Sequence, residues 1–345
     1  MRAARFHAPN QPLSIDEVPD PTPGPLDVVV EVAACGICAS DLHFIHGEMP
    51  LPVPPPVTMG HEAAGTIVAV GDAVQGWAEG DRVSINAGRS CEQCERCISG
   101  ALEECLRPQV MGVHYDGGFA PLMSTRWYTL ARVPDSVSFE HAAIASDSVG
   151  TPYAALLDRA NLRPGERVGI WGIGGLGTHG IQIARMAGAA FIAAIDPLPA
   201  ARERALALGA DVALDPGEDV RGAIKAATGG RGLNLAADMV GNPAATQQGL
   251  ACLERGGRVV VCGQSLQSLD AGPLLGLSFR GLSILGHLGY RKRHLEEILQ
   301  LVASGRLDLS GSITDRLPLD RVNEGVDRLT RKDESIVRLV VEPGT

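Results

Sequence analysis

The sequence lacks an apolar run long enough to cross a membrane. A membrane-spanning helix needs about 18 or more such residues, and the longest candidate, Ala187 to Ile195, stops at Asp196. The N-terminus also lacks a signal-peptide pattern, because proline and acidic residues follow Met1 before an apolar stretch can form. We therefore expect a cytoplasmic protein in a reducing environment.

An excess of positive charge is missing too. The chain has 30 basic and 40 acidic residues, a formal charge of -10, which is the wrong sign for binding a phosphate backbone or an anionic membrane. We expect no nucleic-acid and no membrane partner. No repeat of fixed period is present, which disfavours a solenoid or a propeller.

What remains is an ordinary globular composition. Apolar residues make up 45% and charged residues 20% of 345 residues, enough for two domains with a substantial core. Six of the eight cysteines fall between Cys35 and Cys105. In a reducing compartment such crowding favours metal ligands or catalytic thiolates over disulfides.

The texture of the chain changes near Gly150. Before it, short alternating stretches such as Val28 to Val32 and Gly65 to Val70 predict a β-rich domain, with proline-rich connections around residues 19–25 and 52–56. After it, apolar runs alternate with alanine-rich helical segments. We predict strands at 168–171, 191–195, 212–214, 235–240, 258–262 and 282–285, and helices near 175–187, 198–208, 219–227, 243–253 and 272–276.

This alternation predicts an α/β fold with a doubly wound parallel sheet covered on both faces. Beyond His287, a helix near 292–304 and a β-like segment at 336–341 most simply rejoin the first domain.

A dinucleotide fingerprint opens the second domain. Gly172, Gly174 and Gly177 form G-x-G-x-x-G between a predicted strand and a helix. The glycines permit a tight turn, a close approach of the pyrophosphate and close helix-strand packing. Asp196 ends the next predicted strand, 24 residues after Gly172, where a carboxylate accepts hydrogen bonds from ribose hydroxyls and repels a 2'-phosphate. NAD is therefore favoured over NADP.

A second signal is the array Cys91, Cys94, Cys97 and Cys105. Four thiolates at this spacing can close a tetrahedron around zinc and leave no open position, as in structural zinc sites. The glutamates around these cysteines disfavour a nucleic-acid-binding zinc ribbon.

A third signal is dispersed over Cys38, His61 and Asp147. A thiolate, an imidazole and a carboxylate can make a three-ligand zinc site with one open position. Spacing alone leaves other interpretations open: Cys35 or Cys38 as small buried groups, His61 as a core histidine, and Asp147 as a helix N-cap.

Taken together, the motifs resemble the zinc-containing alcohol dehydrogenases of the medium-chain dehydrogenase/reductase superfamily over essentially the whole chain. The segments Cys38-Ala-Ser40-Asp41-Leu-His43, Gly60-His61-Glu62, the four-cysteine lobe, Asp147 before Thr151-Pro-Tyr, and the fingerprint follow in the family's order. The resemblance implies a GroES-like catalytic domain at 1–149 and 288–345, with the zinc lobe at about 88–108, and a Rossmann domain at 150–287.

The resemblance assigns the catalytic zinc to Cys38, His61 and Asp147 and the structural zinc to the four-cysteine lobe, two zinc ions per chain. Asp41 would orient His61 as an outer partner. Glu62 lies beside the zinc in the family and is an alternative ligand. The implied site lies between the two domains.

The resemblance also implies a proton relay and a set of cofactor contacts. Ser40 and His43 would carry the alcohol proton toward solvent, although a surface histidine without a role stays possible for His43. The residues implied to contact NAD(H) are Thr151, Gly172, Gly174, Gly175, Leu176, Gly177, Asp196, His287 and Arg338.

By family position the substrate pocket includes Phe44, Met49, Ala87 and His114. Ala87 stands where many relatives have an aromatic residue, which favours secondary, cyclic or longer-chain alcohols and their carbonyl products. The expected activity is reversible hydride transfer between such an alcohol and NAD. A sorbitol- or threonine-type dehydrogenase is the alternative, and a catalytically silent zinc-binding or redox-sensing protein is a third possibility. Relatives are commonly homodimers or homotetramers.

Overall fold

The computed structural model describes residues 1–345 as two compact units. One consists of Met1–Asp147 with Arg291–Thr345, and the other of Ser148–Tyr290. We refer to them as unit 1 and unit 2 and describe each by itself. The predicted domain boundaries after residues 149 and 287 stay a prediction. No helix of either unit combines the length and apolar character that a membrane span requires.

Unit 1 is organised around a seven-stranded, mostly antiparallel sheet. Its strands run in the order β10-β6-β5-β3-β18-β17, and β9 also pairs with β3. Their bounds are β3 Asp27–Ile37, β5 Glu62–Val70, β6 Arg82–Ile85, β9 Leu122–Arg126, β10 Leu130–Arg132, β17 Ile313–Pro318 and β18 Arg338–Glu342.

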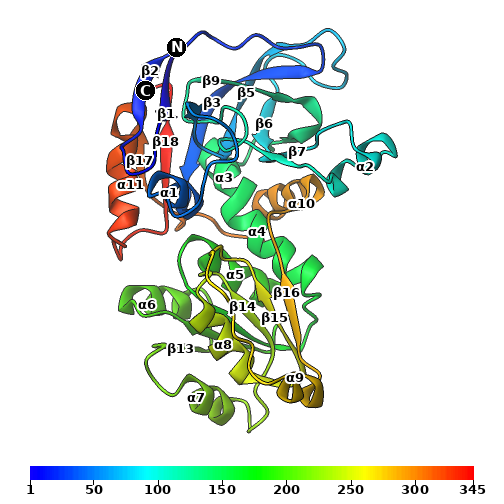
Figure 1. Cartoon of the computed structure of the whole chain (residues 1–345), viewed down its shortest axis with the longest axis vertical. Helices are drawn as coiled ribbons and strands as arrows, with labels where there is room; N and C mark the ends of the chain where they lie inside the picture. Colours follow the sequence, from blue (N-terminus) through cyan, green and yellow to red (C-terminus); the bar gives the residue numbers. More distant parts are fainter. The chain divides into compact units, whose positions relative to one another are not determined.

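A strand from the C-terminal part of unit 1 lies inside this sheet, between β3 and the edge strand β17. β18 pairs antiparallel with β3 and parallel with β17, so the red C-terminal strand lies beside blue strands from the N-terminus (Figure 1). Leu339, Val340 and Val341 are fully buried. Burial of consecutive residues means that both faces of β18 are covered.

Smaller elements complete unit 1. The remaining strands are β1 Arg2–Phe6, β2 Ser14–Glu17 and β4 Val57–Thr58, which form a three-stranded sheet, and the pair β7 Gly88–Arg89 and β8 Gln109–Val110. The helices are α1 Ala39–Ile45, α2 Glu95–Ile98, α3 Phe139–Ile144, α10 Lys292–Ala303 and α11 Val322–Thr330, with 3-10 turns at Leu102–Glu104, Trp127–Thr129 and Leu319–Arg321.

Unit 2 contains a six-stranded sheet of parallel strands in the order β13-β12-β11-β14-β15-β16. This is the strand order of dinucleotide-binding folds. From the centre of the sheet, β11, β12 and β13 follow one another toward one edge, and β14, β15 and β16 follow one another toward the other. The strands are β11 Arg167–Trp171, β12 Phe191–Ile195, β13 Val212–Leu214, β14 Leu233–Asp238, β15 Leu253–Val261 and β16 Ser283–Gly286. The predicted doubly wound sheet is confirmed.

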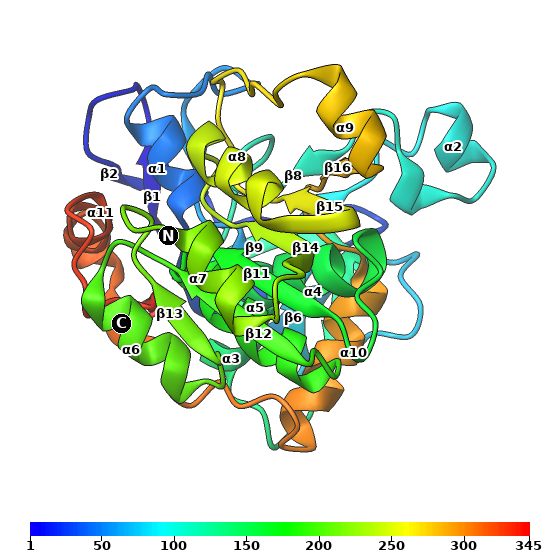
Figure 2. The same ribbon diagram turned by 90° about the horizontal axis from the view of Figure 1, so that it is seen from below.

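The helices of unit 2 fall into two groups. The first contains α4 Gly150–Tyr153, α5 Gly175–Met186 and α6 Pro199–Ala207, and the second α7 Val220–Ala227, α8 Pro243–Cys252 and α9 Leu274–Arg280. α5 packs on β11 and β12, whereas α8 packs on β14 and β15. Because right-handed crossovers run outward in opposite directions from the centre of the sheet, these two helices cover opposite faces (Figure 2).

Several predicted elements of unit 2 have other bounds. β15 begins at Leu253 instead of residue 258. β14 ends at Asp238 instead of Val240, because the Asp238 carboxylate accepts hydrogen bonds from the N–H groups of Val240 and Gly241 and turns the chain. The short helix predicted at 272–276 is α9, Leu274–Arg280, and ends at Gly281 with φ 61°. A left-handed glycine is the usual residue just past a helix end.

A half-buried arginine binds the segments next to the start of β11 in unit 2. Arg258 of β15 binds both oxygens of Glu166 at 2.9 and 2.7 Å and also donates to the carbonyl groups of Ala160 and Asn161. Burial by itself would raise the pKa of Glu166, but hydrogen bonds from Arg258 and from the Arg163 N–H lower it below its usual value. Both charged side chains are 18% exposed.

Glu166→Gln should therefore lower the stability of the protein at pH 7 by about 1 to 3 kcal/mol, the range for hydrogen bonds to charged groups. A carboxyl whose folded pKa is depressed stabilises the fold above its unfolded pKa of about 4.3 and loses this effect as pH falls below it. Urea titrations should show a constant gap between wild type and variant from pH 7 to about pH 5, and the gap should close as the pH falls below about 4. Glu203→Gln, at an exposed residue of α6 without a side-chain partner, is the control; an equal loss in the control would contradict the assignment.

Candidate active site and metal centres

Strand pairing brings the two halves of the dispersed motif together. Cys38 follows β3 and is the N-cap of α1, whereas His61 directly precedes β5. In the antiparallel register Gly36 of β3 lies opposite Glu62 of β5. The end of one strand therefore meets the beginning of the other, and the thiol and the imidazole reach the same point.

Asp147 arrives from a different kind of element. It lies in a π-helical segment, Ala145–Val149, that continues α3. The alternative that Asp147 is a helix N-cap is wrong, because the chain is already helical before it. π-helical turns inside helices often occur at functional sites, since the extra residue displaces a side chain from the regular helical positions.

Four side chains form one cluster, in which Cys38, His61 and Glu62 are buried and Asp147 is half-buried. The ligand atoms of Cys38, His61, Glu62 and Asp147 all lie within 4.8 Å of one another. Cys38 Sγ is 3.3 Å and His61 Nε2 is 3.7 Å from Asp147 Oδ2. Cys35 is fully buried in the core and does not belong to the cluster.

Asp41 contacts two members of the cluster, His61 and Cys38. One of its carboxylate oxygens lies 3.1 Å from His61 Nδ1, and the other accepts the backbone N–H of Cys38 at 3.0 Å. The residue is fully buried. This contact occupies Nδ1 of the ring, so that Nε2 is the nitrogen that faces the cluster.

Glu62 faces a second buried partner. Its Oε1 accepts a short hydrogen bond from Nη2 of Arg338, and both side chains are almost completely buried. Arg338 is therefore not a solvated arginine. Its register beside β3 explains the contact, because the neighbouring Leu339 pairs with Ile37. The other oxygen of Glu62, Oε2, is buried without a hydrogen-bond partner.

The cluster fits a zinc ion. Burial and the adjacent Asp147 carboxylate raise the pKa of the Cys38 thiol, and burial raises the pKa of the Glu62 carboxyl to about 7 despite Arg338. Burial opposes a charge on His61, but the Asp41 and Asp147 carboxylates outweigh it and raise the pKa of the imidazole. Sulfur, imidazole nitrogen and carboxylate oxygen are the ligands that zinc takes in proteins. A divalent cation would offset the unfavourable crowding of acidic groups.

Two candidate relay residues lie on α1 next to this cluster. Ser40 Oγ is 3.6 Å from Cys38 Sγ. His43 lies one helical turn further on, and its Nδ1 is 2.5 Å from Glu48 Oε2. The spacing of three residues places Ser40 and His43 on one side of the helix.

The four-cysteine array forms the second metal candidate. Its sulfur atoms lie within 4.8 Å of one another, with Cys94 3.4 Å and Cys91 3.9 Å from Cys97. A zinc ion with bonds of 2.3 Å to four sulfurs requires separations of about 3.8 Å. Hydrogen bonds from the backbone N–H groups of Leu106 and Cys97 lower the pKa of Cys94 to about 6, which favours the thiolate that a metal needs.

The fingerprint glycines are placed as their predicted roles require. Gly172 follows β11 with φ 85°, and a side chain at Gly177 would collide with the carbonyl oxygen of Gly172. Gly174, the N-cap of α5, has open space where a side chain would begin. The N-terminus of α5 is therefore accessible to an anion.

Asp196 ends β12 close to this loop, with neighbours that the sequence analysis missed. Its oxygens accept the N–H groups of Ile173 at 2.7 Å and Leu198 at 2.8 Å. Arg202 binds the carbonyl oxygen of Asp196, and Arg204 binds that of Ile173. These guanidinium groups reduce the repulsion that Asp196 alone would exert on a 2'-phosphate. Their spacing after Asp196 on a predicted helix was the signal available in the sequence.

The other predicted cofactor residues lie at different places in unit 2. Thr151 is buried in α4. Gly175 and Leu176 begin α5 and are half-buried. His287 follows β16 and donates its backbone N–H to Val261. Their contacts with a cofactor stay predictions.

The four predicted substrate residues do not share a described cavity. Phe44 packs against the core of unit 1, to which Ala87 belongs. Met49 donates its N–H to the His43 carbonyl oxygen. His114 Nδ1 accepts the N–H of Val110 within a local turn, and burial lowers the pKa of its ring. Their substrate role stays a prediction.

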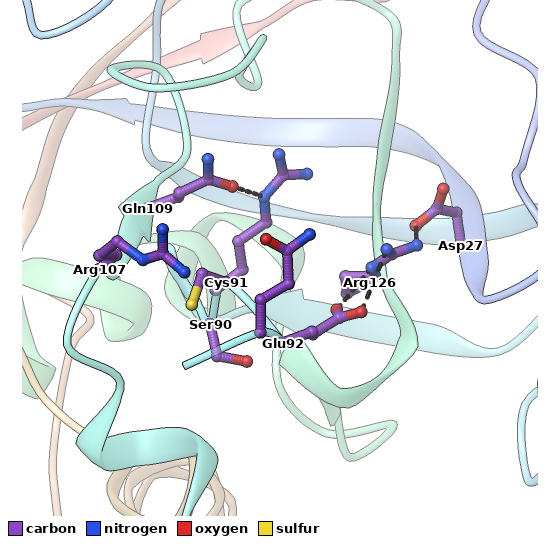
Figure 3. Close-up of a pocket in the computed structure, with 9 residues that line it drawn as sticks. Asp27, Ser90, Cys91, Glu92, Arg107, Gln109 and Arg126 are labelled. Carbon is purple, nitrogen blue, oxygen red and sulfur yellow. Dashed lines mark hydrogen bonds and ion pairs between the residues drawn. The ribbon is translucent and has the colours of Figure 1, made fainter. Parts of the chain in front are cut away.

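A polar cavity of about 620 Å³ lies elsewhere in unit 1, beside the four-cysteine lobe (Figure 3). The charges on one of its walls compensate one another, because Arg126 binds Asp27 at 2.8 Å and Glu92 at 2.7 Å. Apart from the Cys91 thiol, its lining side chains are polar or charged. The full lining is Asp27, Arg89, Ser90, Cys91, Glu92, Gln93, Arg107, Gln109 and Arg126. It contains none of the residues predicted to bind substrate.

Known proteins share both halves of this chain. Residues 24–135 match the alcohol dehydrogenase GroES-like domain, and residues 175–304 match the zinc-binding dehydrogenase family. The chain belongs to the zinc-containing alcohol dehydrogenase family of medium-chain dehydrogenases/reductases, as its motifs predicted, and is an oxidoreductase of that family.

Individual relatives cover nearly the whole chain. An alcohol dehydrogenase of Geobacillus stearothermophilus is 33% identical over 96% of both chains. A sorbitol dehydrogenase of Bacillus subtilis is 32% identical, covering 99% of this chain and 97% of its own. An L-threonine 3-dehydrogenase of Symbiobacterium thermophilum is 32% identical over 95% and 94%. A solved structure of an NAD-dependent alcohol dehydrogenase superposes with a TM-score of 0.90 at 31% identity, covering both chains completely.

Cys94→Ser should lower the zinc content of the purified protein and its melting temperature, because three sulfurs and a hydroxyl hold zinc more weakly than four thiolates. Metal analysis and thermal unfolding measure both effects. Cys252→Ser, at a buried cysteine outside either cluster, should leave the zinc content unchanged. Equal zinc in wild type and Cys94→Ser would rule out the lobe as a metal site.

Proposed function

We propose that the protein is a zinc- and NAD-dependent alcohol dehydrogenase with two zinc ions per chain. The observation that carries this proposal is the buried cluster of a thiol, an imidazole and two carboxylates around a single point. Such a cluster is unfavourable without a cation. Its sulfur, nitrogen and oxygen atoms are the ligands that zinc takes in proteins. Membership of the dehydrogenase family supplies the reaction class.

In this proposal Cys38, His61 and Asp147 hold the catalytic zinc, and Glu62 is a fourth carboxylate within reach. The bound ion would lower the pKa of an alcohol at its open position and polarise a carbonyl group in the reverse direction. Asp41 fixes the orientation of the His61 ring. Arg338 keeps the Glu62 side chain in place. Its positive charge offsets the negative charge that Glu62 adds beside the three ligands.

The remaining roles belong to the relay and to the fingerprint. A bound nicotinamide cofactor would supply the hydride acceptor. The accessible N-terminus of α5 would bind its pyrophosphate, and Asp196 would accept hydrogen bonds from its adenosine ribose hydroxyls. Ser40 and His43 carry the alcohol proton away from the reacting oxygen toward solvent.

Secondary, cyclic or longer-chain alcohols are the proposed substrates, because Ala87 leaves more room than an aromatic residue would. A polyol or amino-alcohol activity is the second candidate. It is favoured by the sorbitol and L-threonine dehydrogenases, whose identities of 32% nearly equal that of the alcohol dehydrogenase.

The wild-type enzyme should form NADH with cyclohexanol and long primary alcohols, and more slowly with sorbitol or threonine. NAD should give a higher kcat/KM than NADP, because Asp196 repels a 2'-phosphate, although Arg202 and Arg204 reduce the difference. Initial rates over this panel with both cofactors measure both preferences.

Cys38→Ala should abolish turnover, because removal of a metal ligand typically destroys a catalytic zinc site. The lobe variant Cys94→Ser is the matched control and should retain part of its activity. Activity confined to sorbitol or threonine would replace the first candidate by the second. Bound zinc without turnover on any substrate would favour the silent protein.

We also propose that the protein is a homo-oligomer in which unit 2 binds a second copy. β16 is an edge strand with one free side, and the neighbouring segments expose large apolar side chains. Leu266, Leu274, Leu275, Phe279 and Leu288 are between 67% and 82% exposed. Pairing of two edge strands about a twofold axis would satisfy the free backbone groups and cover these side chains together.

The double variant Leu275→Glu/Phe279→Glu should shift the protein from a dimer or tetramer toward the 36.1 kDa monomer, because burying the new charges is costly. Sedimentation or light scattering gives the mass. Ile98→Glu, at an apolar residue of α2 that is also exposed, should keep the wild-type mass. A monomeric wild type, or an unchanged double variant, would reject this interface.

A further inference from the structure

The turn after α1 brings the Glu48 side chain into contact with His43. The helix ends at Ile45 with His46 as its C-cap, and Gly47 follows in the left-handed region with φ 71°. The chain then reverses, so that the Met49 N–H donates to the His43 carbonyl oxygen at 3.0 Å. Glu48 lies on this returning segment, and its Oε2 reaches His43 Nδ1 at 2.5 Å.

The turn itself is held in place. A side chain at Gly47 would meet Pro9 Cβ at 3.0 Å and Asn10 Nδ2 at 3.4 Å, and the Asn10 N–H donates to the Ile45 carbonyl oxygen at 2.6 Å. The N-terminal segment therefore fixes the path of residues 46–49. The contact between Glu48 and His43 follows from this fixed backbone as well as from attraction between the side chains.

The contact selects one tautomer of the imidazole. An ionised carboxylate only accepts hydrogen bonds, so His43 Nδ1 must carry the proton in this pair. In the neutral ring the lone pair is then on Nε2. The only side-chain bond of the ring is the one to Glu48, which leaves Nε2 available to accept a proton.

We propose that Glu48 is a positioning residue that holds His43 as a base with its Nε2 available for the alcohol proton. The inference rests on the proposed function, in which His43 belongs to the relay. As the proton arrives, a bond to Nε2 forms and the O–H bond that held it breaks, with its electron pair left on oxygen. The carboxylate of Glu48 stabilises the resulting imidazolium, which then releases the Nε2 proton to water.

A purely structural role for this pair is too small to imitate the effect. His43 is 27% and Glu48 is 61% exposed, and exposed ion pairs contribute little to stability. Neutral variants of Glu48 should therefore fold, bind zinc and bind cofactor as the wild type does. A change in the rate of the chemical step can then be assigned to the orientation and charge of His43.

The test is a double-mutant cycle on the holoenzyme with cyclohexanol and NAD. The observed quantity is the stopped-flow rate of NADH formation in the first turnover, which is independent of slow product release. Glu48→Gln should lower this rate roughly tenfold with the KM for NAD unchanged. Glu48→Asp keeps the charge and should recover most of the rate, whereas Glu79→Gln, at an exposed glutamate without a partner, should have no effect.

The partner mutation identifies the route of the effect. His43→Gln should slow the first turnover at least as much as Glu48→Gln, and the double variant should be no slower than His43→Gln alone. Independently, the ¹⁵N shifts of the His43 ring in the wild type should show a protonated Nδ1, with a mixture of tautomers in Glu48→Gln.

The outcomes separate this inference from the proposed function. A slow His43→Gln combined with a fast Glu48→Gln would overturn the role of Glu48 and leave the relay intact. Additive losses in the double variant would overturn it too, because Glu48 would then act without His43. A His43→Gln variant as fast as the wild type would contradict both the relay and the role of Glu48. NADH formation by the wild type with the alcohols tested above would still support the proposed dehydrogenase activity.

Discussion

The antiparallel pairing of β3 with β5 and with β18 is the constraint on which the metal centre depends. It sets Glu62 opposite Gly36 and Leu339 opposite Ile37, so that the ends of three strands meet at one buried point. A slip of one residue would turn the Glu62 and Arg338 side chains to the opposite face of the sheet. The apolar pattern of these strands thus specifies the chemistry as firmly as it specifies the core.

Charge balance is the second requirement of this point. A thiol, three carboxyl groups and an imidazole lie close together, and Arg338 is the guanidinium placed against them. The cost of burying these acids is tolerated only when a cation compensates them. The polar cavity beside the four-cysteine lobe differs from the metal centre in this respect. There Arg126 already neutralises Asp27 and Glu92, so these acids do not require a metal cation.

Local patterns sufficed to predict unit 2. Alternating apolar runs and helices gave β12 and β13 with their observed bounds, because a buried parallel strand is written continuously in the sequence. The spacing of Cys91, Cys94, Cys97 and Cys105 predicted a cluster for the same reason: its members are close along the chain. The meeting of Cys38, His61 and Asp147 needed the family resemblance, since their proximity depends on strand register and on a π-helical turn that no short pattern encodes. The contact of Arg338 with Glu62 and that of Glu48 with His43 were not predicted, because each depends on the path of a backbone returning from elsewhere.

The position of β18 has a consequence for synthesis on the ribosome. Residues Ser148–Tyr290 form one uninterrupted stretch whose sheet uses no strand from outside it, so this unit can close as soon as it emerges. The strands of unit 1 that precede unit 2 cannot complete their sheet at that stage, because the place between β3 and β17 is filled only by Arg338–Glu342, which follow unit 2 in the sequence. Until then an interior strand edge stays open to solvent and to pairing with other nascent chains. Unit 1 thus begins before unit 2 on the ribosome but is completed after it.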